Sequence, residues 1–354
     1  MEHLQDGPTA SRPTYRLIQV LRAIAALMVV LHHAVLMLSQ RDGVPIGNWI
    51  NGGAGVDIFF VISGFVMTVS SAPLRDTRHA ARTFLARRLE RIAPMYWLAT
   101  TVKVLLVLVT PALAMNGLGT RWHVVASYLF LPSGSEPVVV VGWTLVYEMA
   151  FYAMFALVLT LGWPLLKTLG PALVVLALLR LIPHLPLPAM LAWYANTIVL
   201  DFLYGILLAL GLRWVVRMPK ELAFPLGIAG FAVLLNWMEP NTSFWRGVLW
   251  GGPAAAVVAG ALALERPWGA KMPRWLLELG DASYSIYLVH GFVLPLFGVV
   301  LLRMGTHWPG VVPVSLVLMV VLSTVCGELV YRGVERPMTQ WLKGRRRTAI
   351  PANG

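Results

Sequence analysis

Long apolar stretches dominate this sequence and leave few folds open to it. Ten of them follow one another along the 354 residues, each close to the roughly 20 residues that a helix needs to cross a bilayer. A backbone in lipid must satisfy its hydrogen bonds internally, so we predict an all-α, polytopic integral membrane protein of about ten transmembrane helices around an internal cavity. The stretches cover 17–38, 55–71, 93–112, 143–162, 165–183, 192–212, 223–238, 247–264, 284–302 and 311–331.

Composition supports a membrane protein over a soluble one. Charged residues make up 12% of the chain, whereas a soluble domain carries about 25%. A net charge of +12 would suggest nucleic-acid binding in a soluble protein, but basic cytoplasmic loops explain it here, so we expect no nucleic-acid partner. We predict a single membrane domain over 1–345, followed by a basic and polar cytoplasmic tail over 346–354.

The distribution of Lys and Arg predicts the orientation. If the N-terminus is cytoplasmic, 21 of these residues lie in inside segments and only four in outside segments. This asymmetry predicts that both termini are cytoplasmic, with the longest external segment at 113–142. The four outside residues are Arg41, Arg121, Arg246 and Arg303.

The first apolar stretch carries two polar residues on one face. Arg22 and His33 are eleven residues apart, which on a helix returns to within roughly 20° of the same direction and separates them by roughly 16 Å. His32 points about 80° away from Arg22. Ionisable groups inside a bilayer are costly, which favours a functional role. The alternative is an interfacial anchor, Arg22, and a packed histidine.

Two carboxylates lie near the external ends of other stretches. Asp57 and Glu148 are expected at a depth similar to His33, where a carboxylate would orient an imidazole and raise its basicity. Asp57 has the alternative role of capping its helix. Tyr152 lies one turn after Glu148 on the same face, and Trp143 has the alternative role of an interface aromatic.

The remaining candidates lie toward the cytoplasmic side. Arg88 and Arg91 share a helix face at the predicted boundary, and arginine suits bidentate phosphate binding. Their alternative role is a positive-inside signal that contacts lipid phosphates. His290 lies about two turns into its stretch, as a functional or a structural histidine.

These stretches together resemble the membrane acyltransferase-3 family, in particular its exopolysaccharide-type O-acetyltransferases. The resemblance covers roughly residues 14–342, and it rests on the order and spacing of several short motifs. The motifs lie at 22–33 (Arg-x10-His), 55–65, 88–94, 143–148, 283–290 and 334–337.

The resemblance implies transfer of an acyl group from cytoplasmic acyl-CoA, commonly acetyl-CoA, to a sugar hydroxyl of an exported polysaccharide or glycolipid. It implies a location in the bacterial inner membrane, and we expect no metal. His33 is expected to be the general base, with Asp57 and Glu148 as further catalytic residues. Donor binding is assigned to Arg22, Arg88 and Arg91. Residues expected to bind substrate or line the cavity are Trp143, Tyr147, Tyr152, Ser283, Tyr284 and His290.

A different class of function stays open on the sequence alone. A transporter or flippase of lipid-linked sugars would use the same intramembrane Arg, Asp, Glu and His residues as a proton or substrate relay. No pair of interrupted helices stands at matching places in two halves of the sequence, which favours the enzyme. Neither the acceptor glycan nor the oligomeric state follows from the sequence.

Overall fold

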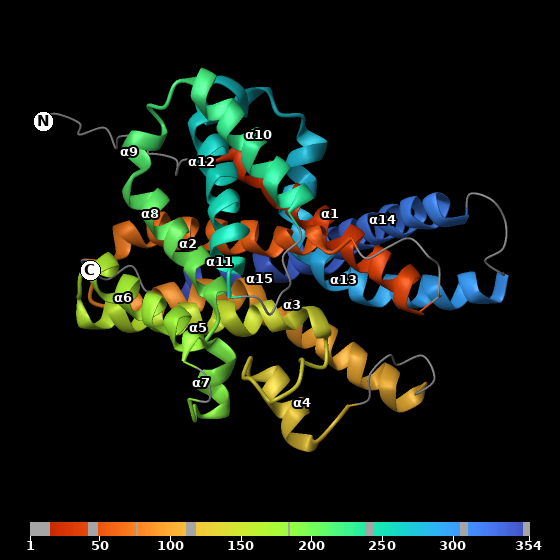
Figure 1. Cartoon of the computed structure of the whole chain (residues 1–354). Helices are drawn as coiled ribbons and strands as arrows, with labels where there is room; N and C mark the ends of the chain where they lie inside the picture. The colour runs from red at the N-terminus through yellow and green to blue at the C-terminus, as the bar shows by residue number, and fades with distance from the viewer. Residues whose placement is uncertain are drawn as a thin grey trace, which may run out of the picture.

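The fold is a bundle of helices, as predicted (Figure 1). The computed structural model describes residues 15–41, 49–75, 77–110, 118–182, 185–237, 244–304 and 311–349. Within these ranges every regular element is a helix. The predicted tail over 346–354 is described only to Ala349, where the basic helix α15 (Arg336–Ala349) ends.

Seven helical segments of the described chain are long and apolar enough to cross a membrane, which establishes a multi-pass membrane protein. Two helices extend well beyond their predicted stretches, because α3 and α13 each begin with a polar, charged segment. The main helices of these segments are α1 (Arg16–Leu36), α2 (Gly55–Ser71), α3 (Ala80–Val109), α5 (Trp143–Leu161), α12 (Gly251–Trp268), α13 (Arg274–Met304) and α14 (Val311–Val330).

Three further predicted spans form helices that are too short to meet the same criterion, so the count of about ten is not confirmed. They are α6 (Leu165–Leu178), α8 (Leu200–Leu210) and α10 (Lys220–Asn236). The predicted span over 192–212 is broken by Asn196, whose side chain accepts a hydrogen bond from the backbone N–H of Ile198 and caps a 3-10 turn before α8. Such local capping competes with a continuous helix.

α1 lies at the centre of the bundle, where it contacts α2, α12, α13 and α14 (Figure 1). α2 packs most closely against α8, and glycines make this possible. A Cβ on Gly64 would lie 2.2 Å from the Phe202 carbonyl oxygen, and one on Gly205 would lie 2.2 Å from that of Val61. Only glycine permits the two backbones to approach this closely, so α8 packs directly against α2.

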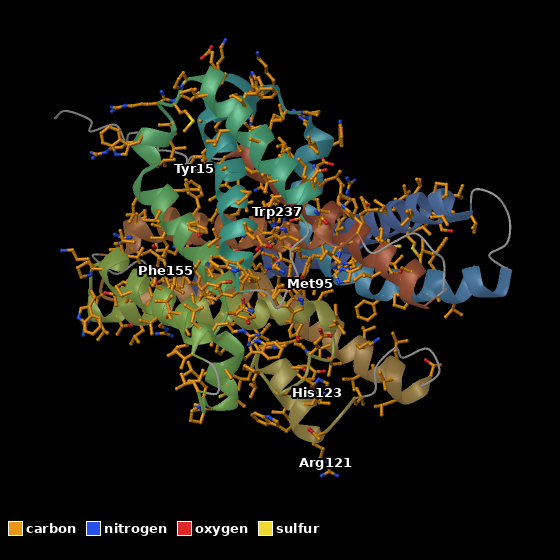
Figure 2. The ribbon with its side chains drawn as sticks, viewed as in Figure 1. Tyr15, Met95, Arg121, His123, Phe155 and Trp237 are labelled. Carbon is orange, nitrogen blue, oxygen red and sulfur yellow. The ribbon has the colours of Figure 1, made fainter. Side chains whose placement is uncertain are left out.

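A small helical element after α3 lies at one edge of the bundle. In the predicted external segment, α4 (Arg121–Tyr128) carries Arg121 and His123 at the lower edge of the view in Figure 2. Both ring nitrogens of His123 lie 2.7 Å from backbone oxygens, one of Leu118 and one of Glu136. These contacts tie the two sides of the segment together. Residues 111–117 lie outside the described chain.

Candidate active site

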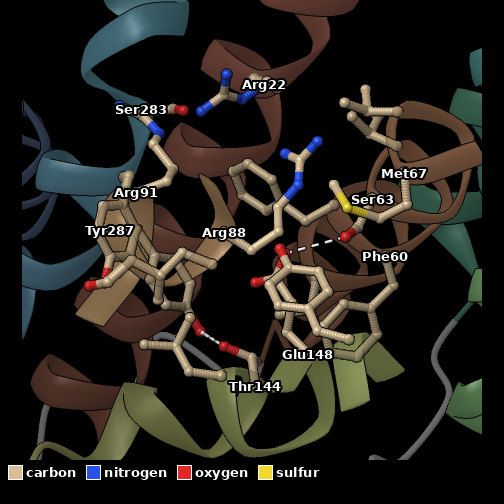
Figure 3. Close-up of a pocket in the computed structure, with 18 residues that line it drawn as sticks. Arg22, Phe60, Ser63, Met67, Arg88, Arg91, Thr144, Glu148, Ser283 and Tyr287 are labelled. Carbon is tan, nitrogen blue, oxygen red and sulfur yellow. Dashed lines mark hydrogen bonds between the residues drawn. The ribbon is translucent and has the colours of Figure 1, made fainter. Parts of the chain in front are cut away.

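Side chains from α1, α2, α3, α5 and α13 line a partly open cavity of about 170 Å³ (Figure 3). We call it the arginine cavity, since three arginines line it. An internal cavity was predicted, and the structure brings a majority of the candidate residues to it. The candidates that line it are Arg22, Arg88, Arg91, Glu148, Tyr152, Ser283 and Tyr284.

The three arginines reach the cavity with different partners. Arg22 donates a hydrogen bond to the side-chain oxygen of Gln19 at 3.1 Å, and Arg88 donates one to Ser70 Oγ at 2.6 Å. Arg91 forms an ion pair with Glu335 Oε1 at 2.5 Å, and Arg91 remains 31% exposed. Three guanidinium groups and the carboxylates of Glu148, Glu335 and Asp281 therefore lie in or beside the cavity. The guanidinium groups offer charge-assisted hydrogen bonds to an anionic or polar ligand.

Glu335 was not among the site candidates, yet it is fully buried beside the cavity. Its second carboxylate oxygen accepts a hydrogen bond from Ser285 Oγ at 2.6 Å. A buried carboxylate that is paired and hydrogen-bonded in this way holds Arg91 in place. The carboxylate belongs to the π-helical turn Tyr331–Glu335 that follows α14, and its second partner, Ser285, lies on α13. The motif at 334–337 contributes to the site through this contact.

Glu148 lies in the same cavity as the arginines. Its Oε1 accepts a hydrogen bond from Ser63 Oγ of α2 at 3.0 Å and another from the Tyr152 hydroxyl (Figure 3). The expected placement of Glu148 and Tyr152 on one helix face is therefore present. Ser63 was missed as a site residue, although it lies inside the motif at 55–65.

His33 and His290 form a pair beside the cavity, and neither lines it. His33 Nδ1 lies 2.9 Å from the Val29 carbonyl oxygen, which can only accept, so this contact places the proton on Nδ1 and leaves Nε2 as the basic nitrogen. His290 Nε2 lies 3.3 Å from His33 Nδ1, and the ring centroids are 5.0 Å apart. Arg22, on the same face of α1 about three turns before His33, lines the cavity, whereas His33 does not.

Tyr287 separates the cavity from the histidine pair. It lines the cavity, and its ring centroid lies 5.7 Å from that of His290. The Tyr287 hydroxyl is fixed by a hydrogen bond to the Val141 carbonyl at 2.9 Å and lies 2.9 Å from Thr144 Oγ1. Phe59 packs edge-on against it at 6.1 Å and lines the cavity as well. These two rings form one wall of the cavity.

The structure does not place Asp57 beside His33. Asp57 instead forms an ion pair with Arg246, with Nη2–Oδ2 at 2.6 Å and Nε–Oδ1 at 3.2 Å. Both side chains are buried, at 0% and 1% exposed, and the guanidinium lies over the Trp250 ring at 4.8 Å. A third group, the fully buried carboxyl of Asp201 on α8, faces Asp57. Arg246, predicted from the sequence to lie in an outside segment, is therefore buried within the bundle.

The signal for this ion pair was present in the sequence. A carboxylate inside a span needs a counter-charge, and Arg246 stands at the start of an apolar stretch, where such a charge can be found.

Two other expected cavity residues also lie elsewhere. The Tyr147 hydroxyl donates to the Trp193 carbonyl at 2.5 Å, and Trp143 packs edge-on against the Tyr147 ring at 5.9 Å; neither lines the cavity. Among the described residues, no three His, Cys, Asp or Glu side chains gather as metal ligands would.

Comparison with known proteins gives consistent matches. The "Acyltransferase domain" family model matches residues 16–328. The exopolysaccharide production protein ExoZ of Rhizobium meliloti (strain 1021) is 35% identical over 312 residues, 84% of this chain and 93% of that protein. The putative peptidoglycan O-acetyltransferase YrhL of Bacillus subtilis (strain 168) is 26% identical over 90% of this chain and 54% of its own length.

A further relative is nodulation protein 10 of Rhizobium leguminosarum bv. viciae, which is 28% identical over 78% of this chain and 82% of that protein. No solved structure matches the chain. The family match spans nearly all of the helical domain and every cavity-lining residue described above. The chain therefore belongs to the membrane acyltransferase-3 family and is an acyltransferase.

Proposed function

We propose that this protein transfers an acyl group, in the first instance acetyl, from cytoplasmic acyl-CoA to a hydroxyl group of an exported or cell-surface polysaccharide. The observation that carries the proposal is the arginine cavity, which combines three guanidinium groups with an apolar aromatic wall. Arg88 and Arg91 would donate charge-assisted hydrogen bonds to the part of the donor that enters the cavity, and the acyl end would lie against Phe59 and Tyr287. The relatives named for exopolysaccharide production and peptidoglycan O-acetylation support a glycan acceptor.

The size of the cavity limits what part of the donor enters it. About 170 Å³ is close to the roughly 150 Å³ of an engineered protein cavity that binds benzene. It is below the roughly 300–1,000 Å³ of pockets that enclose a drug-sized ligand. The acyl thioester and the first atoms of the pantetheine arm fit this space, and the nucleotide stays outside it.

The proposed chemistry uses the histidine pair on the far side of the aromatic wall. The acceptor hydroxyl attacks the thioester carbonyl, its proton passes to Nε2 of His33, and the carbon–sulfur bond breaks to release the CoA thiolate, which then takes up a proton. His290 holds the His33 ring in the orientation that presents Nε2. Glu148 is the rival base, because it lies in the cavity itself.

The proposal includes an inner-membrane location with both termini in the cytoplasm, so that the arginine side faces acyl-CoA. The excess of Lys and Arg in the predicted inside segments supports it. It also includes a lipid-linked glycan as one form of the acceptor.

The test is acyl transfer in membranes. Membranes from producing cells receive radiolabelled acetyl-CoA, and the label is measured in the polysaccharide fraction. Glycans from cells with and without the gene are compared by mass spectrometry in parallel. We expect label in the glycan and a mass difference of one acetyl group, both absent with His33→Ala. Export of an unmodified glycan that depends on the gene, without label, would show a flippase and refute the proposal.

A further inference from the structure

A second basic site lies near the arginine cavity, where α2 connects to α3. It is a surface depression of about 600 Å³. One side carries four residues with cationic or titratable side chains, and the other is the C-terminal end of α5. Its basic residues are Arg75, Arg78, His79 and Arg82. We call it the basic depression.

The depression is rich in positive charge. Among the described residues that line it none is acidic, and none of its arginines forms an ion pair with a described carboxylate. Asp76, the one acidic residue of the segment 75–82, lies outside the described residues, and the three arginines outnumber it. The arginines are exposed, so a ligand from solution reaches them. The opposite side, with Leu159 and Leu161, is apolar, and Leu161 is 44% exposed. A ligand with phosphates at one end and a flat apolar ring at the other matches both sides.

Its position relative to the arginine cavity follows from α3 and α5, which line both, and from the segment that follows α2. On α3, Arg82 in the depression is six residues before Arg88 in the cavity, roughly 9 Å along the helix. On α5, Leu159 is seven residues after Tyr152, roughly 10 Å. Arg75 follows Met67 of α2 by eight residues, roughly 12 Å at helical rise. All three place the depression beyond the same end of the cavity.

We infer that the basic depression binds the nucleotide of the acyl-CoA donor, with Arg75, Arg78 and Arg82 on its phosphates and the adenine against the end of α5. The inference rests on the proposed function. Because the cavity takes only the thioester end, the nucleotide needs a separate site within reach of the pantetheine arm. The distance from cavity residues to depression residues along each segment, roughly 9–12 Å, is shorter than the roughly 16 Å that separates Arg22 from His33 on α1.

The test compares two donors that differ only in the nucleotide. Purified full-length protein in phosphatidylcholine nanodiscs binds radiolabelled acetyl-CoA, and unlabelled acetyl-CoA or S-acetyl-pantetheine competes. We expect Arg78→Ala/Arg82→Ala to weaken acetyl-CoA binding by about 10-fold or more, since charge-assisted hydrogen bonds to phosphate are lost. Binding of S-acetyl-pantetheine should stay unchanged, which also shows that the variant is folded.

The matched control is Arg213→Ala/Arg217→Ala, two exposed arginines that do not line the depression. It should leave binding of both donors unchanged. The single variants Arg78→Gln and Arg82→Gln replace the double variant if that one does not fold, and each should weaken acetyl-CoA binding selectively.

Three results would overturn the inference while the proposed function stands. They are an equal loss for both donors, no loss for either, or a loss seen only in phosphatidylglycerol nanodiscs and independent of the nucleotide. The last would assign the arginines to lipid phosphate. Failure of wild-type protein to bind acetyl-CoA at all would refute the proposed function itself.

Discussion

The buried ion pair between Asp57 and Arg246 allows a test of whether Asp57 has a structural or a catalytic role. Replacing Arg246 by Met keeps an unbranched side chain of similar length but removes the guanidinium. This removes the only charge-balancing contact to Asp57 that the described residues make. Two buried carboxyls, of Asp57 and Asp201, then face each other without a cation. Breaking one side of a buried ion pair costs about 3–5 kcal/mol.

That loss corresponds to a measurable change in melting temperature. An unfolding entropy of about 2.1 cal/mol/K per residue gives roughly 0.74 kcal/mol/K for 354 residues. A destabilisation of about 3–5 kcal/mol therefore lowers the melting temperature by roughly 4–7 °C. The assay is thermal unfolding of the purified protein in detergent, followed by tryptophan fluorescence, to which Trp250 beside Arg246 contributes. Asp57→Leu added to Arg246→Met should recover part of the loss, because an apolar pair fills the site without a buried charge.

The result that refutes this reasoning is specific. If Arg246→Met melts within about 1 °C of the wild type, the pair is not structural. If Asp57→Asn keeps the wild-type melting temperature while acetyl transfer falls by about 100-fold, Asp57 acts in catalysis, as the sequence alone suggested.

Three further predictions follow from the site. His33→Ala should lower transfer by about 10²–10⁴-fold with an unchanged melting temperature, and His32→Ala, on a different face of α1, should lower it much less; equal losses would show that the rings act together without a single base. Arg88→Ala should raise the KM for acetyl-CoA several-fold, and steady-state kinetics that show an unchanged KM at normal expression would make Arg88 a topology signal only. Reporters fused at the C-terminal end and inserted at 133–135 should lie on opposite sides of the membrane, and the same side for both would refute the predicted orientation.

The sequence was sufficient for the fold class and for much of the cavity. Apolar length predicts helices that cross a membrane, and the spacing of Glu148 and Tyr152 follows from one helix turn. Arg22, Arg88 and Arg91 could be found because charge in or at the edge of a span is rare enough to stand out.

The contacts between helices could not be predicted in the same way. Asp57 pairs with a residue 189 positions away, and Arg91 pairs with Glu335, 244 positions away. Periodicity gives the face that a residue occupies, but which other helix lies opposite depends on packing. The shortness of α8 could not be predicted either, because hydropathy does not show that Asn196 caps a new turn inside the apolar stretch 192–212.

The close glycine contact between α2 and α8 has a consequence for how this protein enters the membrane during synthesis. α8 has 11 residues and rises roughly 16 Å, about half the thickness of the hydrocarbon core, so it has too few residues to insert stably by itself. Gly64 and Gly205 give it a fitted surface on a helix that is synthesised well before it. We therefore expect α8 to insert against α2, which is synthesised before it. A bulky residue at Gly205 would show itself as degradation of the nascent chain before any loss of catalysis.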